Sequence, residues 1–276
     1  MTKPIRKLLI ANRGEIALRI MRTAHAMGIS TVAVFEDEDR EALYVREADE
    51  SFFLPAGFLD QQTLLEICRN VQVDTIHPGY GFLSENSEFV RKVEKAGILF
   101  VGPSADAMDR MGEKTAARLE AKAANVPLLP GAEVEDGAAL TVEERRKIVG
   151  DIGLPVVLKA AAGGGGKAQA IIEEEAEIDL AFEKVIREAE RLYRSKSLVI
   201  ERYLVRARHV EVQVIGNAAG KNFALFDRDC SAQRNNQKII EEAPAPQLPE
   251  GVRKALHASA IRLADHVGYK NAGTME

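Results

Sequence analysis

The clearest candidate for chemistry in this sequence is a run of four glycines between two lysines. The glycines occupy residues 163–166, after the apolar residues 154–160 and between Lys159 and Lys167. Glycines let backbone N–H groups approach phosphate oxygens, and the lysines supply positive charge. The segment does not fit the P-loop pattern G-x-x-x-x-G-K-[ST]. A flexible linker or tight turn is the alternative, but the apolar stretch and the two lysines favour a loop that covers phosphate.

A second set of polar side chains has the spacing of one strand face. His209, Glu211 and Gln213 alternate with Val210 and Val212, and alternate residues of a strand point to the same face. Such a strand lines up an imidazole, a carboxylate and an amide. A solvated surface strand has the same pattern, so this segment alone does not separate a site from an exposed face.

The third candidate is a polar segment, residues 227–238, that a proline-containing segment, residues 241–244, follows. Such polar density is unusual for a loop without a function. Cys230 and His209 suggest a thiol nucleophile with its base, but no third group that would orient the base is evident. A metal site built from Cys230 and Cys68 is disfavoured, because the sequence has neither a C-x-x-C pair nor paired histidines.

The fourth candidate, residues 77–86 (HPGYGFLSEN), follows a predicted strand. In open α/β sheets ligands bind at the carboxyl ends of the strands. A turn that opens a helix, with Ser84 as its N-cap, explains the proline and the glycines equally well. That alternative leaves Glu85 and Asn86 without a role.

Regular alternation of strands and helices positions these candidates in the first hundred residues. The apolar pattern there switches repeatedly between strand and helix spacing, with short connections. Such alternation predicts a mostly parallel, doubly wound sheet with helices on both faces. The predicted strands are residues 7–11, 31–35, 73–76 and 98–101, and the predicted helices are residues 14–27, 59–70 and 84–95.

The pattern changes after a proline- and glycine-rich boundary at residues 126–131. Long helical segments and antiparallel strand patterns follow, which predicts an α+β second domain. We therefore expect a doubly wound domain over residues 1–112 and a second domain over residues 113–276. The predicted helices are residues 113–124, 173–194 and 252–267, and the predicted strands are residues 154–160, 198–200, 209–215 and 222–226.

The composition limits the class of protein. The chain has 276 residues, 46% of them hydrophobic, so it can bury a sizeable core. A formal net charge of −5 disfavours binding to nucleic acids or membrane surfaces. No apolar stretch has the length of a membrane span or a signal sequence, and the two cysteines are too few for a disulfide framework. We expect a cytoplasmic protein.

Taken together, these segments resemble the biotin carboxylase family of ATP-grasp enzymes, along essentially the whole chain. The matching motifs are residues 10–17, 77–86, 159–167, 227–231 and 237–246, in one order. The resemblance implies a Rossmann-like pre-ATP-grasp domain over residues 1–112. It also implies an incomplete ATP-grasp domain over residues 113–276, with a mobile lid at about residues 131–203.

The resemblance also implies roles for individual residues. Lys238 matches the lysine beside bicarbonate, and Glu276 matches the first of two carboxylates that hold Mg²⁺. Lys114 and Lys159 match lysines that contact ATP phosphates. The remaining matches are the glycine-rich lid and other nucleotide contacts, namely Gly163, Gly164, Gly165, Gly166, Glu201, Arg202, Leu204, His209, Gln233 and Asn236.

The implied reaction is the ATP- and bicarbonate-dependent carboxylation of biotin through carboxyphosphate. Its cofactors would be ATP and Mg²⁺ (or Mn²⁺), with biotin as the carboxyl acceptor. Its partners would be a biotin carboxyl carrier protein and a carboxyltransferase, and family members commonly form homodimers. Lysines, backbone amides and Mg²⁺ suit this chemistry because phosphoryl transfer needs charge neutralisation.

Several alternatives stay open. The leading interpretation is part of an acetyl- or propionyl-CoA type carboxylase, and a pyruvate or urea carboxylase is the second. A carbamoyl-phosphate synthetase or another ATP-grasp ligase is less favoured, because residues 229–231 and 242–244 fit biotin carboxylases better. A nucleotide-binding relative that has lost catalysis is the fourth.

Two segments depart from the family's sequence. After the glycines the family has Lys-Gly-Met-Arg, whereas this chain has Ala168 and Ala170 in place of the glycine and the arginine. We expect Ala168 to lose the positive φ that glycine permits, and Ala170 to remove a cation. Asn235 replaces an arginine, while Asn236 can still bond a ribose hydroxyl. The changes at Ala168 and Ala170 are expected to weaken lid closure or phosphate contact, and Asn235 is expected to weaken any ion pair made there.

The chain ends at Glu276, before the family's second Mg²⁺ carboxylate and before the arginine near biotin. An ATP-grasp sheet without its later strands would have an open edge and exposed core. We therefore expect this polypeptide alone to lack biotin-dependent ATPase activity and to be poorly soluble.

Overall fold

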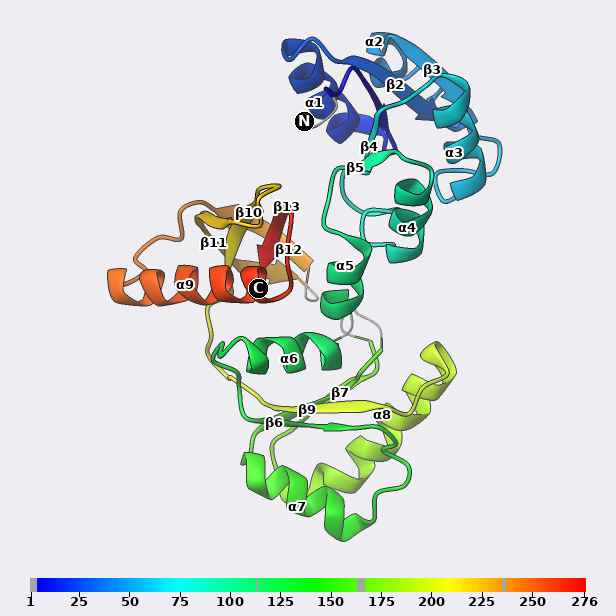
Figure 1. Ribbon diagram of the computed structural model, residues 1–276. Helices are drawn as coiled ribbons and strands as arrows, with labels where there is room; N and C mark the ends of the chain where they lie inside the picture. Colours follow the sequence, from blue (N-terminus) through cyan, green and yellow to red (C-terminus); the bar gives the residue numbers. More distant parts are fainter. Residues whose placement is uncertain (1–3, 113, 163–166, 235–236) are drawn as a thin grey trace. The chain divides into compact units, whose positions relative to one another are not determined.

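The computed structural model contains two compact units. The first comprises Met1–Asp109 and Tyr269–Gly273, and the second comprises Arg110–Gly268 and Thr274–Glu276. No helix in the described part of the chain has the length and apolar character that crossing a membrane requires. The structure describes residues 4–112, 114–162, 167–234 and 237–276 (Figure 1).

A parallel five-stranded sheet forms the centre of the first unit, in the order β3-β2-β1-β4-β5. This order reverses direction at β1, as in doubly wound sheets, and confirms the fold class predicted from the sequence. The strands are β1 (Lys7–Ile10), β2 (Ser30–Phe35), β3 (Glu50–Phe53), β4 (Thr75–His77) and β5 (Leu99–Phe100).

Helices cover both faces of this sheet. One apolar cluster joins the sheet to α1 (Gly14–Ala26) and α2 (Leu43–Glu47). A second cluster joins the opposite face to α3 (Gln61–Asn70) and α4 (Ser87–Lys95). Successive residues of β1 alternate between the two clusters, as a strand buried on both faces requires. After β5 the chain enters α5 (Ala105–Gly112).

The N-terminus of α4 differs from the prediction, because Asn86 rather than Ser84 is its N-cap. The Asn86 side chain accepts a hydrogen bond from the backbone N–H of Phe89 at 2.8 Å. Ser84 lies in the preceding turn, where its own N–H donates to the carbonyl of Gly81 at 2.9 Å. Serine and asparagine are equally good caps, so the turn decides which side chain reaches the free amide.

The described residues after α5 form two four-stranded sheets, the first of which is antiparallel in the order β6-β9-β7-β8. Helix α6 (Lys114–Ala123) precedes it, and α7 and α8 pack on its apolar cluster. The predicted helix over residues 173–194 begins only at Ile178, because Glu175–Glu177 form a 3-10 turn. The elements are β6 (Gly131–Val134), α7 (Val142–Ile152), β7 (Val156–Ala160), β8 (Gln169–Ile172), α8 (Ile178–Tyr193) and β9 (Leu198–Arg202).

The other four-stranded sheet has the order β12-β11-β10-β13. The polar segment of residues 227–238, which reads as a loop in the sequence, instead forms the second part of β11 and the start of β12. Helix α9 packs on one face of this sheet, where Asn222 Nδ2 donates to Asp265 Oδ1 at 2.8 Å. The elements are β10 (Val210–Gly216), β11 (Asn222–Arg234), β12 (Gln237–Glu242), α9 (Glu250–His266) and β13 (Asn271–Met275).

An extra residue in β11 changes which face its side chains occupy. Val212 pairs with Asp227 but Val214 pairs with Ala224, so three residues of β11 span two of β10. This is a β-bulge, and Phe226 in it has a φ of 64°. The bulge turns Asp227 toward α9 and leaves Arg228 on the opposite, open face of the sheet.

Candidate functional site

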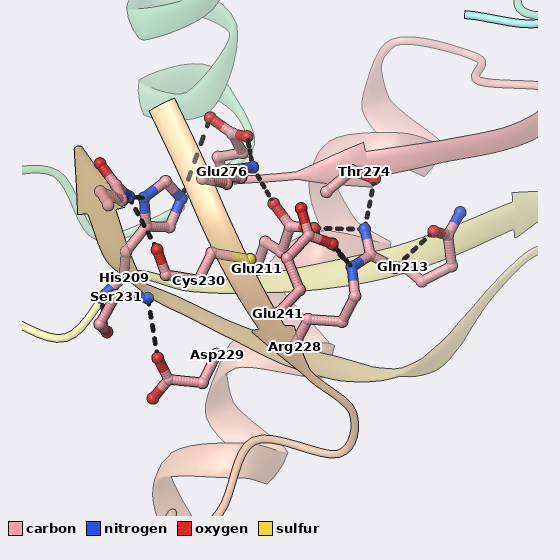
Figure 2. A network of polar contacts seen from close by, with 12 residues as sticks. His209, Glu211, Gln213, Arg228, Asp229, Cys230, Ser231, Glu241, Thr274 and Glu276 are labelled. Carbon is pink, nitrogen blue, oxygen red and sulfur yellow. Dashed lines mark hydrogen bonds and ion pairs between the residues drawn. The ribbon is translucent and has the colours of Figure 1, made fainter. Parts of the chain in front are cut away.

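The open face of the β10–β11 ribbon carries a buried carboxylate between two cations. The side chain of Glu211 on β10 is only 2% exposed. Lys238 on β12 donates from Nζ to Glu211 Oε2, and Arg228 on β11 donates from Nε to Glu211 Oε1 at 2.6 Å (Figure 2). A buried carboxylate needs such partners, because burial without them costs several kcal/mol, roughly the desolvation of an ion.

Arg228 connects three strands. Its Nη1 donates to Gln213 Oε1 at 2.8 Å, and its Nη2 donates to Thr274 Oγ1 at 3.0 Å (Figure 2). The exposed Glu241 lies at 3.6 Å from its Nε. The planar guanidinium thus fixes Glu211 and Gln213 relative to β13.

The charges in this cluster reinforce one another. Burial alone would raise the pKa of Glu211, but hydrogen bonds from Lys238 and Arg228 hold the pKa below its ordinary value. Burial alone would lower the pKa of Lys238, but hydrogen bonds to Glu211 and Glu276 raise that pKa well above its ordinary value. Lys238 therefore holds its proton more tightly than an ordinary lysine.

Glu276 and His209 complete the cluster. Lys238 Nζ also donates to Glu276 Oε1, and His209 Nε2 lies 4.0 Å from Glu276 Oε2. Gln233 Nε2 lies 2.9 Å from His209 Nδ1 and donates to the carbonyl of Cys230 at 2.8 Å. The structure thus brings together four residues that the family resemblance selects, namely His209, Gln233, Lys238 and Glu276.

Cation binding is a second capacity of this cluster. Among the described residues, ligand atoms of His209, Glu211 and Glu276 lie within 4.8 Å of one another.

Cys230 is buried, and its burial raises the pKa of the thiol. A thiol that stays protonated is a poor nucleophile, which agrees with the low weight that the sequence gives to thiol chemistry.

A second ion-paired group lies on the β6-β9-β7-β8 sheet. Lys159 on β7 donates from Nζ to Glu201 Oε2 on β9 at 2.8 Å, and Arg118 on α6 donates to Glu201 Oε1 at 2.6 Å. Burial alone would raise the pKa of Glu201, but the two cations hold it below its ordinary value. Arg202 points to the other face of β9, where its Nη1 lies 3.4 Å from the carbonyl of Ile152.

Ala168 takes the conformation that its residue type was expected to lose. It has a φ of 49° and is buried. The backbone of Ala160 donates to the carbonyl of Ala168 at 2.9 Å, which closes the β7–β8 hairpin. The expectation that alanine abandons the positive φ is therefore wrong, because hairpin pairing holds the backbone there.

Similarity to known proteins agrees with this geometry. The model of the biotin carboxylase N-terminal domain matches residues 4–108, and the model of the carbamoyl-phosphate synthase L chain ATP-binding domain matches residues 113–276. The biotin carboxylase domain of Hydrogenobacter thermophilus 2-oxoglutarate carboxylase, solved as a dimer with MgADP, ADP and bicarbonate, matches with a TM-score of 0.88 and 38% identity. The match covers 99% of this chain and 61% of that chain. The chain belongs to the biotin carboxylase family.

Biotin carboxylase relatives with other acceptors are equally similar. The chain is 45% identical to the mitochondrial methylcrotonoyl-CoA carboxylase subunit alpha of Dictyostelium discoideum, with 99% of this chain and 40% of that protein covered. It is 43% identical to pyruvate carboxylase of Aspergillus terreus, with 98% and 23% covered. The chain therefore spans less than half the length of these two relatives.

The remaining residues that the resemblance to biotin carboxylases selects lie outside these two ion-paired groups or outside the described residues. Leu204 follows β9 and is 48% exposed. Lys114 begins α6, but its side chain is not described. Gly163, Gly164, Gly165, Gly166 and Asn236 lie outside the described residues, as does Asn235.

The sequence did not single out Arg228 and Arg118 as site residues. Arg228 lies inside the matched motif of residues 227–231. Its partner Glu211 could have been found from the strand spacing of residues 209, 211 and 213, which places Glu211 on the same strand face as His209. Arg118 had no signal, because its partners are 15 and 83 residues away along the chain.

Proposed function

We propose that this chain supplies the nucleotide- and bicarbonate-binding part of a biotin carboxylase. In this reaction a bicarbonate oxygen attacks the γ-phosphorus of ATP and ADP leaves. The C–O bond of the resulting carboxyphosphate then breaks, phosphate leaves, and the carboxyl group is transferred to biotin on a carrier protein, which gives up a proton. The observation that carries the proposal is Lys238, whose ammonium Nζ donates to both Glu211 and Glu276. The related domain that binds MgADP and bicarbonate supports it.

The role proposed for Lys238 is to bind bicarbonate and offset its charge. Two anions, bicarbonate and the γ-phosphate, must approach each other, and fixed cations lower the cost of that approach. Glu211 and Glu276 hold the ammonium from two sides, so it needs no reorganisation when the anion arrives.

The nucleotide would bind with its phosphates near Lys159 and Lys114, and the four glycines at residues 163–166 are proposed as further phosphate contacts. Glu201, Arg202 and Leu204 on and after β9 are the proposed contacts near the base. His209, Gln233 and Asn236 are proposed as further nucleotide contacts.

A divalent cation fits the residues present. Glu276 would offer a carboxylate oxygen, the kind of ligand that Mg²⁺ (or Mn²⁺) prefers over a thiol. When bound, the cation would neutralise phosphate charge.

The domain organisation is part of the proposal: an N-terminal domain over residues 1–112, an ATP-grasp domain over residues 113–276 and a lid at about residues 131–203. The proposed partners are a biotin carboxyl carrier protein, a carboxyltransferase and a second copy of the protein, in the cytoplasm. Acyl-CoA and pyruvate are both proposed as final acceptors, since relatives of both kinds are similar.

Nucleotide binding tests the proposal. Titration calorimetry of the chain with MgADP should give saturable binding to one site. Lys159→Gln should raise the Kd at least about tenfold, because a charged phosphate contact is lost. Lys254→Gln is the matched control: this lysine of α9 is 76% exposed, so its loss should change the Kd by less than about twofold. No MgADP binding, or equal effects of the two variants, would contradict the proposal.

A further inference from the structure

Arg118 is an arginine of α6 that makes contacts with three other segments of the second unit. Its side chain is 14% exposed. Nη1 donates to Glu201 Oε1 on β9 at 2.6 Å, Nε donates to Glu133 Oε1 on β6 at 2.8 Å, and Nη2 donates to the carbonyl of Leu129 at 3.2 Å. Only a guanidinium has donors in a fork that reaches three acceptors at once.

The backbone next to Arg118 leaves room for this fork. A Cβ atom at Gly131 would lie 2.9 Å from Arg118 Nη2 and 2.6 Å from the carbonyl oxygen of Ile200. Glycine at the start of β6 therefore permits the close approach of the guanidinium to β9.

Glu201 divides its two oxygens between two cations. Oε1 accepts from Arg118 and Oε2 accepts from Lys159 at 2.8 Å. With Glu133, which also pairs with Arg118, the four side chains carry no net charge, whereas without Arg118 they would carry a net charge of −1. Arg118 thus fixes the direction in which the Glu201 carboxylate points. It also makes the net charge around Lys159 more positive for another anion that approaches.

We propose that Arg118 is a positioning residue of the nucleotide site, acting through Glu201 on the ammonium of Lys159. The inference rests on the proposed function, which places Lys159 on the ATP phosphates. Without Arg118, Glu201 would neutralise Lys159 and its carboxylate could rotate. The phosphates would then meet a less positive site, in which the ammonium of Lys159 is no longer held in one place.

Three variants test the role of Arg118 by calorimetry with MgADP. Arg118→Met keeps the apolar stem, removes the charge and should raise the Kd about tenfold. Glu133→Gln weakens only the contact to β6 and should stay within about twofold of the parent protein. Arg118→Lys keeps the positive charge but has no guanidinium fork, so its Kd for MgADP should lie between those of the other two variants. If Arg118→Met does not fold, Arg118→Lys takes its place in the test.

A double-mutant cycle separates positioning from simple anchoring of α6. If Arg118 acts through Glu201, Arg118→Met should weaken MgADP binding by less than about twofold in a Glu201→Gln background. Equal effects in both backgrounds would overturn the inference. A lower melting temperature with unchanged MgADP affinity would also overturn it, because it would show an anchor alone. If the parent protein does not bind MgADP, the proposed function fails together with the inference.

Discussion

Glu211 is the residue on which the open-face cluster depends. It is buried, and both of its oxygens accept hydrogen bonds from cations. Its removal leaves Lys238 and Arg228 facing each other without the intervening charge. A partly buried cation without its partner is costly, so Glu211 is a structural requirement as well as a neighbour of the proposed bicarbonate site.

Glu211→Ala should lower the free energy of unfolding by about 3 kcal/mol, because it breaks a buried ion pair. The measurement is urea unfolding followed by circular dichroism. Glu241→Gln is the matched control: its carboxylate is exposed and lies 3.6 Å from Arg228, so it should cost no more than about 0.5 kcal/mol. Equal costs for the two variants would show that burial of Glu211 contributes nothing.

Asp229 predicts a specific dependence of stability on pH. Hydrogen bonds from Ser231, and then from Arg208, lower its pKa from 3.8 to about 2. The ionised carboxylate therefore stabilises the fold fully above pH 3.8, the pKa of the unfolded chain. This contribution is lost as the pH falls toward about 2, the pKa in the folded protein. Asp229→Asn should flatten the stability curve between these two values in urea unfolding at a series of pH values. An unchanged slope would contradict this assignment.

At the scale of elements, the bulge in β11 determines which residues face the site. With regular alternation Asp227 and Asn222 would point to opposite faces, yet both contact α9. Asp227 accepts from Arg253 Nε at 2.9 Å and from the backbone of Ala245 at 2.8 Å. The extra residue at Phe226 lets both side chains face α9. The same bulge places Arg228 beside Glu211 on the opposite face of the sheet.

Phe226 allows a test of the bulge, because its side chain is 65% exposed and its φ is 64°. Phe226→Gly should leave the free energy of unfolding unchanged or raise it by up to about 1 kcal/mol, since glycine adopts this φ without strain. Phe226→Val should lower it by about 1–2 kcal/mol, because a β-branched residue resists the left-handed region. Urea unfolding measures both. Equal stabilities would mean that the bulge backbone is not under strain.

Elements with strong periodicity could be predicted, and those that depend on distant partners could not. The apolar runs of β1 and β2 and the helical spacing of α1 indicated a parallel doubly wound sheet. Residues 227–238 read as a loop because charged residues are rare in strands. In the structure Asp227 and Arg228 are satisfied by α9 and β10, which local sequence does not reveal.

At the scale of the whole molecule, the sequence could indicate which residues gather at the candidate site but not how they are paired. Lys238, His209, Gln233 and Glu276 were selected by resemblance to biotin carboxylases, and they meet on one sheet. The buried position of Glu211 and the fork of Arg118 arise from long-range contacts. The resemblance therefore predicted the chemistry, while three-dimensional pairing determines the protonation and orientation of each group.

The central claim is that the cluster around Lys238 binds bicarbonate, and ¹³C nuclear magnetic resonance of labelled bicarbonate tests it most directly. With MgADP present, the bicarbonate line should broaden on addition of the parent protein. It should stay narrow with Lys238→Gln, because that variant lacks the cation. Glu241→Gln should broaden the line as the parent protein does. A line that stays narrow with the parent protein, or broadens equally with Lys238→Gln, would contradict the account.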